Sequence, residues 1–397
     1  MDSTAVPMPK KFRLVFEVAF CVAAASLTPS AAVVAVAADG ALDDPLTITA
    51  LRGLEDREGR LQAVVGVALV DTYMSDQAIA QLAAMLGHES AAGFRDRDRA
   101  LTRFRADRAG YRLEAASLYW GGTSPFFVVD TDRASDDVSD LWTARGTRGG
   151  CYYTFSRQRP RPSAWYAPDE GEPCGLWRDQ HSQWLGLSGP SHMPLSGEIR
   201  QALADAEGVS CELVPAGLGT DRVLRLTWQS GGGQSGSVSR SRYDIAPDRD
   251  WAVILASRIT RDAGGETRGV IRTWRDVSPV DNTSVWLPRR HTRWQVHTND
   301  SGAMAVDRVV DVSISSLTAG TEPDSWLDFF PVGTYLVSPR SQVPAGFIDD
   351  YRPDLEASRA VWRATVHWSE TPWREAVPEV PDVVNELVRE ATLGPDG

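Results

Sequence analysis

Residue types that could carry out catalysis are spread along this chain without the spacing of a known catalytic motif. The segment 233–237, Gly-Gln-Ser-Gly-Ser, lacks the final glycine of a nucleophile elbow. The glycine run that begins at residue 231 lacks the Gly-Lys-Ser/Thr ending of a phosphate-binding loop. The adjacent carboxylates Asp349 and Asp350 could support glycoside hydrolysis, but nothing around them distinguishes them. We therefore expect a protein that is not an enzyme. A hydrolase with an unrecognised carboxylate site is the alternative.

Histidine spacing favours neither a metal site nor a cofactor. The pair His88-Glu89 is not followed by a second histidine at the spacing that a helical metal site requires. His291 and His297 lie six residues apart in one expected strand, so their side chains would share a face. Two histidines on a strand are too little to define a metal, and we expect none.

The cysteines leave two arrangements open. Cys21 lies in the N-terminal apolar segment, and Cys151, Cys174 and Cys211 follow it. Cysteines of exported proteins tend to pair, and a disulfide between Cys151 and Cys174 would close the loop between them. Three buried thiols fit the sequence equally well. The chain has no Cys-x-x-Cys or Cys/His spacing of a structural zinc site.

The first 38 residues are typical of a secretory signal peptide. Lys10, Lys11 and Arg13 form a basic flank, and an alanine-rich apolar segment follows from 18 to 38. Small residues allow cleavage after Ala37 or Ala38. An uncleaved anchor and a lipid anchor at Cys21 are the alternatives. We therefore expect a periplasmic or secreted protein without a transmembrane segment after signal removal.

The charge of the chain narrows the choice of partners. The net charge is −12 at pH 7, and the only lysines lie in the expected signal peptide. Nucleic-acid binding depends largely on neutralising phosphates, so we expect that this acidic chain does not bind nucleic acid. The arginines at 157, 159 and 161 could contact an anionic head group or belong to an ordinary exposed loop.

The pattern of apolar residues predicts a mainly β (α+β) fold. Alternation and turn residues indicate an antiparallel meander without crossover helices. We expect three regions: the signal peptide at 1–38, a β domain at 39–340 with a long surface excursion at 157–190, and a C-terminal extension at 341–397 that ends in a helix. Strands are expected at 61–73, 101–105, 111–115, 126–129, 151–155, 223–228, 251–257, 270–274, 286–288, 291–297 and 309–314, and helices after Ser75, at 195–207 and at 380–392. For 61–73 a helix is the alternative.

The segment 327–337, Leu-Asp-Phe-Phe-Pro-Val-Gly-Thr-Tyr-Leu-Val, predicts a strand, a kink and a last edge strand. Pro331 removes a hydrogen-bond donor and favours extended geometry at Phe330. Gly333 permits a sharp turn, and β character resumes at Thr334. We expect the two phenylalanines to close one end of the core, with a ligand contact by Phe329 or Phe330 as the alternative.

Several of these segments together resemble exported bacterial proteins related to the outer-membrane lipoprotein carriers. The resemblance is carried by Phe-Pro-x-Gly-Thr at 330–334, preceded by Asp-Ser-Trp at 324–326, and by the segments 243–253, 275–288 and 309–312. It covers about residues 210–340 well and 45–160 by pattern alone. It implies a highly curved, incompletely closed antiparallel barrel in which helices cover an apolar cavity. In the carriers that cavity holds the acyl chains of lipoproteins. This chain is much longer than the carriers.

These observations favour a non-enzymatic protein of the cell envelope that binds a lipid or an acylated protein in an apolar cavity. The alternative is a structural or interaction module that has a core filled by its own side chains and that contacts an envelope protein. The resemblance places the cavity walls on the concave side of the sheet. The candidate wall residues are Leu224, Leu226, Trp228, Trp251, Val253, Leu255, Trp294, Val296, Val310, Val312, Ile314 and Phe330.

Overall fold

The computed structural model describes about half of the chain, which includes most of the expected β domain. It describes residues 44–85, 97–108, 110–117, 142–148, 151–156, 163–168, 175–177, 179–189, 191, 193–216, 221–231, 236–280, 283–298, 304–319, 335–337 and 346–347. The expected signal peptide, the strand at 126–129, the helix at 380–392 and the arginines at 157, 159 and 161 lie outside these residues.

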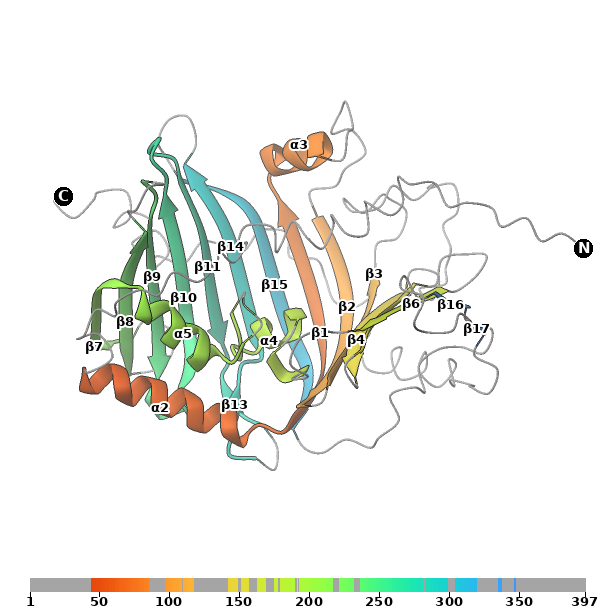
Figure 1. Ribbon diagram of the computed structural model, residues 1–397, viewed down its shortest axis with the longest axis horizontal. Coiled ribbons are helices and arrows are strands. Elements are labelled where there is room, and N and C mark those ends of the chain that lie inside the picture. Colours follow the sequence, from red (N-terminus) through yellow and green to blue (C-terminus); the bar gives the residue numbers. More distant parts are fainter. Residues whose placement is uncertain are drawn as a thin grey trace, which may run out of the picture.

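The described strands form two antiparallel meanders that meet within one sheet (Figure 1). The first meander runs β1 to β6 and the second runs β7 to β15, and β1 pairs with β15 where they join. The strands of the first are β1 (Ala63–Met74), β2 (Arg97–Asp107), β3 (Gly110–Ser117), β4 (Trp142–Arg148), β5 (Cys151–Ser156) and β6 (Ser163–Pro168). Those of the second are β7 (Glu207–Pro215), β8 (Arg222–Gly231), β9 (Val238–Ala246), β10 (Ala252–Arg261), β11 (Thr267–Arg275), β14 (Arg290–Thr298) and β15 (Met304–Ala319).

The sheet is open, because β7 ends it on one side and β17 (Gly346–Phe347) on the other. A separate pair, β12 (Ser278–Pro279) and β13 (Trp286–Leu287), lies between β11 and β14 in the chain. Figure 1 shows the strong twist that runs across the sheet. The expected mainly β fold with a curved, unclosed antiparallel sheet is therefore confirmed.

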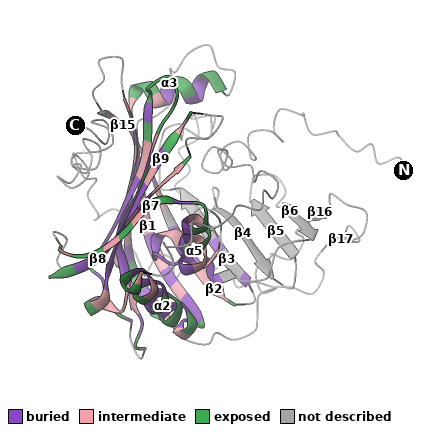
Figure 2. Cartoon of the chain, turned by 60° about the vertical axis from the view of Figure 1, so that its left-hand side comes forward, coloured by how far each residue is buried: buried purple, intermediate pink, exposed green. Residues whose placement is uncertain are grey.

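Helices cover one face of the second meander (Figures 1 and 2). They are α2 (Pro45–Arg60) and α5 (Leu195–Ala204). The 3-10 turn η2 (Gly175–Trp177) and the short α4 (Asp179–Trp184) that follows it instead pack beside β1 to β3 of the first meander. Helix α3 (Asp76–Met85) follows β1 and begins where expected, because the Ser75 hydroxyl accepts a hydrogen bond from the Ala78 amide at 3.2 Å. None of the described helices is long and apolar enough to cross a membrane.

Two expectations about the chain's irregular parts were wrong. The segment 157–190 is more than a surface excursion, because it contains β6 and the buried residues Leu185 and Leu187, which pack in the core beside β1 to β3. The segment at 335–337 forms β16 (Tyr335–Val337), but it is not the edge strand. It pairs in parallel with β6 and antiparallel with β17, so both of its sides carry ladder hydrogen bonds. Phe329, Phe330 and Pro331 lie outside the described residues.

Helix α2 was not expected from the sequence, although its start carries clear local signals. Asp44 is the N-cap and accepts a hydrogen bond from the Thr47 amide at 2.7 Å, and Pro45 occupies the first turn. The buried side chains include Ala50, Leu51 and Leu54, whose spacing places them on one helical face. This face packs on the second meander and makes α2 part of the core.

Helix α2 packs closely at Gly53, where an added Cβ atom would overlap the indole of Trp251, the residue before β10. We expect Gly53→Ala to destabilise the protein by about 1–3 kcal/mol, because the helix must move away from the indole. Gly59 of the same helix has open space at its Cβ position. Gly59→Ala should therefore be neutral or stabilising by up to about 1 kcal/mol. Urea unfolding of both variants measures the difference, and equal stabilities would contradict this packing.

Candidate functional site

The register of the strands divides the side chains between two faces of the sheet. Directly paired residues of antiparallel strands point to the same face. One such row, from β8 across to β1, consists of Leu226, Tyr243, Ala256, Arg272, Arg293, Val310 and Thr72. Leu226, Tyr243 and Ala256 of this row pack with α2 and α5. We call this side of the sheet the helix-side face and the other side the opposite face.

Much of the helix-side face is apolar and buried beneath the helices (Figure 2). On the second meander it packs with Leu51 and Leu54 of α2 and with Ile199 and Leu203 of α5. On the first meander it packs with the segment that contains η2 and α4. Burying apolar surface stabilises by about 25 cal/mol per Å², so this face holds the cover in place.

The candidate wall residues do not all lie on this face. Eight of them belong to or adjoin the clusters on the helix-side face: Leu224, Leu226, Trp228, Trp251, Val253, Val310, Val312 and Ile314. Leu255, Trp294 and Val296 instead lie in a separate buried cluster on the opposite face. Phe330 lies outside the described residues. Ligand binding by any of these residues stays a prediction.

A β-bulge explains why Leu255 lies on the opposite face of the sheet from Val253. Val253 pairs with Ile245, but the register shifts before Leu255, which pairs with Asp244. An extra residue in one strand reverses the alternation of faces beyond it, so residues 253 and 255 point to opposite sides. Trp294 and Val296 alternate regularly with His291, Arg293 and Gln295. However, the sequence does not show whether the even-numbered or the odd-numbered residues of this strand share a face with Leu226.

Helices α2 and α5 are joined by a buried carboxylate. Glu58 accepts hydrogen bonds from the Ser196 amide at 2.9 Å and from the Ser196 hydroxyl. Ser196 lies in the first turn of α5, so Glu58 binds backbone donors that the helix itself leaves unpaired. Burial raises the pKa of Glu58, and the Ser196 hydrogen bonds oppose that rise. This contact ties α2 to α5, and we call the two helices together the cover.

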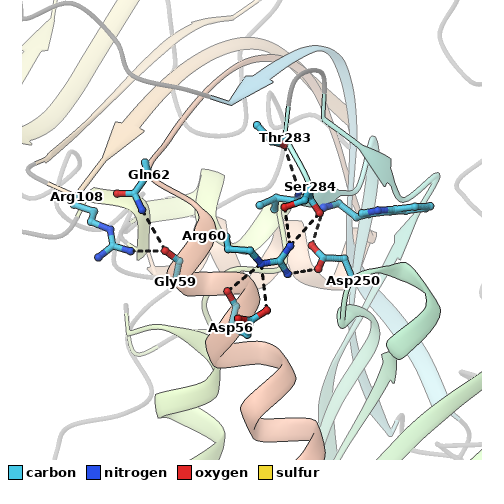
Figure 3. A network of polar contacts seen from close by, with 10 residues as sticks. Asp56, Gly59, Arg60, Gln62, Arg108, Asp250, Thr283 and Ser284 are labelled. Carbon is cyan, nitrogen blue, oxygen red and sulfur yellow. Dashed lines mark hydrogen bonds and ion pairs between the residues drawn. The ribbon is translucent and has the colours of Figure 1, made fainter.

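Arg57 and Arg60 attach the end of α2 to neighbouring loops. Arg57 donates to the carbonyls of Gly186 at 3.2 Å and Trp286 at 3.1 Å. Arg60 forms ion pairs with Asp56 of its own helix and with Asp250, and it donates to Ser284 (Figure 3).

Asp250 completes this attachment from the turn before β10. Its other carboxylate oxygen accepts the Trp286 amide at 3.0 Å, and its backbone adopts the left-handed conformation with φ 57°. Because Asp250 binds both Arg60 and the β13 backbone, one carboxylate ties α2 to the loops at the end of the sheet.

Within the part of the chain that the structure describes, two arginines lie together on the helix-side face without an ion pair to a carboxylate. Arg272 of β11 is 8% exposed and is paired across the ladder with Arg293 of β14, which is half-buried. The Nε atoms of both are enclosed and have no hydrogen-bond partner. Burial and the charges of Arg272 and Arg308 lower the pKa of Arg293 to about 9. Burial also lowers the pKa of Arg272, an effect that Tyr243 and Glu198 oppose.

His291 lies next to this pair on the same face. Its ring stacks on the indole of Trp274 with a centroid distance of 5.2 Å, and its Nδ1 lies 3.3 Å from the carbonyl of Thr273. Burial and the charge of Arg272 lower the pKa of His291 to about 3. His291 and His297 share a face as expected, and His297 Nδ1 lies 2.9 Å from Asp307 Oδ1. The described residues contain no group of three or more side chains that could bind a metal.

His291 should make the protein sensitive to acid. Because its pKa is depressed in the folded state, the unfolded chain binds a proton first as the pH falls below 6.5. We expect the stability to fall by up to about 1.4 kcal/mol per pH unit between pH 6.5 and about 3 from this group. Urea unfolding at several pH values should show a shallower decline for His291→Phe. Identical pH slopes for the two proteins would contradict a buried neutral imidazole.

Sequence reasoning located the strands of this site but missed its charged residues. Arg272 and Arg293 lie within the expected strands 270–274 and 291–297, and Arg272 alternates with the buried Trp274. An arginine on the same face as a buried aromatic residue was the available signal.

For the expected disulfide, Cys151 lies in β5, whereas Cys174 lies outside the described residues. Cys211 is a half-buried free cysteine.

Comparisons with known proteins give only distant likenesses. No family model matches the chain, and no curated protein does. A crystal structure of a DUF1329 family protein from Desulfovibrio piger matches with a TM-score of 0.31 and 9% identity, covering 70% of this chain and 95% of that one. An acetoacetate decarboxylase-like enzyme from Sphingomonas wittichii matches with a TM-score of 0.10 and 12% identity, covering 66% of this chain and 94% of that one. At these TM-scores, neither likeness identifies a family for this chain.

Proposed function

We propose that this protein binds the acyl chain of a lipid or acylated protein between the helix-side face and the cover formed by α2 and α5. The proposed binding is non-enzymatic and takes place in the cell envelope after export. The observation that carries the proposal is the apolar face of an open sheet, which is covered by two separate helices instead of a second sheet. Separate helices can move away from a sheet without breaking its ladder hydrogen bonds.

The free energy gained by burying an acyl chain can offset the loss of side-chain contacts between the cover and the sheet. Each CH₂ group that leaves water contributes about 0.8 kcal/mol, so an acyl chain of ordinary length can replace several leucine contacts. The side chains exchanged would be Leu51 and Leu54 of α2, which now pack with Leu226 and other residues of the face. Helix α2 remains attached at its end through Arg60 and Asp250, which allows the cover to tilt.

The second candidate is an envelope interaction module that has no ligand. The same packing favours it, because Leu226, Ile245 and Leu51 are already buried against one another. In that case the cover would be a permanent part of the core, and partners would bind elsewhere on the protein.

The test is to purify the exported protein, extract it with organic solvent and identify the extracted lipids by mass spectrometry. Uptake of a fluorescent fatty acid by the delipidated protein is measured in parallel. We expect a co-purifying acyl lipid and saturable uptake. The absence of both would contradict acyl binding and favour the interaction module. N-terminal sequencing of the same sample should show a chain that begins at residue 38 or 39, as the expected signal cleavage requires.

A further inference from the structure

We propose that Arg272 and Arg293 bind the anionic head group of an amphiphile, a carboxylate or a phosphate, while its chain lies on the apolar part of the helix-side face. This inference rests on the proposed function and names the class of ligand. Three observations support it. Neither guanidinium has an ion pair within the described chain, aromatic side chains lie beside them, and the other buried arginines of the described chain have acceptors.

The other buried arginines of the described chain all have acceptors. Arg57 donates to backbone carbonyls, Arg99 binds both carboxylate oxygens of Asp71 at 2.5 and 2.7 Å, and Arg242 binds those of Asp244 at 2.9 and 2.6 Å. Buried charged groups are costly unless they are paired, and native proteins rarely leave them unpaired. Arg272 differs from these three, because no hydrogen bond or ion pair of its guanidinium is found within the described part of the chain.

Pairing Arg272 with Arg293 increases this cost. Like charges directly opposite each other on neighbouring strands are destabilising. Arg308 adds a third positive charge near Arg293. Glu198 of α5 is the carboxylate that influences Arg272, but its own oxygen accepts the Ser191 hydroxyl. An anion between the two guanidinium groups would relieve the repulsion and supply the missing acceptors.

The residues around the two arginines favour an amphiphile over a free anion as the ligand. Along β11 and β14, the residues on one side of the pair are Trp274 and His291, whose rings stack on each other. Trp274 belongs to the apolar cluster beneath α2 and α5, so this cluster extends up to the arginines. Beyond the pair on the other side lie Val270 and the polar residue Gln295, which are paired with each other across the ladder. Guanidinium groups bind carboxylate and phosphate oxygens through two parallel hydrogen bonds, which suits either head group.

The test compares three ligands that have the same chain: dodecanoate, dodecyl phosphate and the uncharged dodecanol. Each ligand displaces a bound, uncharged naphthylamine fluorophore from the delipidated full-length protein. We expect the wild type to bind at least one anionic ligand about tenfold more tightly than dodecanol, as charge-assisted hydrogen bonds should provide. Comparison of the two anionic ligands distinguishes a carboxylate head group from a phosphate.

Arg272→Gln and Arg293→Gln should each abolish this preference, because each removes a positive charge that would bind the anionic head group. Arg261→Gln, at the exposed end of β10, is the matched control and should retain the preference. A second readout needs no ligand. Because the Arg272 guanidinium has no ion pair among the described residues, Arg272→Met should match or exceed the thermal stability of the delipidated wild type.

The outcomes separate the two proposals. Equal binding of all three ligands by the wild type and both variants would overturn the head-group site and leave acyl binding in place. A clear loss of stability in Arg272→Met would show that the arginine has a structural partner and would also overturn the site. Failure of all three ligands to displace the fluorophore, or of the fluorophore to bind, would overturn both proposals.

Discussion

Arg57→Ala should destabilise the protein by about 3 kcal/mol or more. Arg57 is 1% exposed, and its guanidinium donates to carbonyls of two chain segments far from α2 in sequence. Its removal leaves the carbonyls of Gly186 and Trp286 without that donor in the interior, where an unsatisfied polar group is penalised. Urea unfolding at neutral pH measures the change.

The matched control for this prediction is Arg52→Ala. Arg52 lies on the same helix, but its side chain is exposed. Substitution there should change the stability by no more than about 0.5 kcal/mol. If the two alanine variants had equal stabilities, Arg57 would not be what attaches α2 to the loops around α4 and β13.

Trp294→Ala should destabilise the protein by about 3–5 kcal/mol without weakening ligand binding. Trp294 is 0% exposed, and it packs with Tyr73, Leu255 and Ile271 on the opposite face of the sheet. Its removal would leave a large cavity there, since the neighbouring strands are fixed by their ladders. The naphthylamine fluorophore would bind on the helix-side face, so its affinity should stay unchanged.

Leu226→Ala gives the comparison on the helix-side face. Leu226 is also fully buried, but it packs with α2 and α5. Its substitution should destabilise by about 2–5 kcal/mol and should also change the affinity for the fluorophore. Equal effects of the two variants on that affinity would contradict a ligand site restricted to one face.

The regular part of the fold could be predicted because its signals are local. The alternation at 223–228 correctly placed Leu224, Leu226 and Trp228 on one face, and the turn before Tyr111 correctly predicted the pairing of β2 with β3. The start of α3 at Ser75 was also correct. In each case, neighbouring residues in the sequence determine the structure.

Other features depend on contacts between distant segments and could not be predicted in this way. The bulge that separates the faces of Val253 and Leu255 leaves no mark in the apolar pattern. The burial of Leu185 depends on its packing beside β1 to β3, which a Gly- and Pro-rich segment does not reveal. The pairing of Arg272 with Arg293 depends on the register of β11 and β14, which is set by the whole sheet.

If a ligand enters between the sheet and the cover, a disulfide that joins α2 to the sheet should block its entry. Thr47 of α2 is buried, and its side chain lies close enough to the thiol of Cys211 on β7 to influence the pKa of that thiol. A Thr47→Cys variant would therefore place two thiols close enough to be joined by mild oxidation. Peptide mapping by mass spectrometry confirms that the bond has formed, and the wild type treated in the same way is the control.

Fluorophore uptake by the delipidated variant is then measured before and after the disulfide is reduced. We expect uptake to be lost while residues 47 and 211 are joined and to return after reduction. Unchanged uptake in the fully cross-linked protein would contradict ligand entry between the sheet and the cover, because the ligand would then bind without any separation of α2 from the sheet.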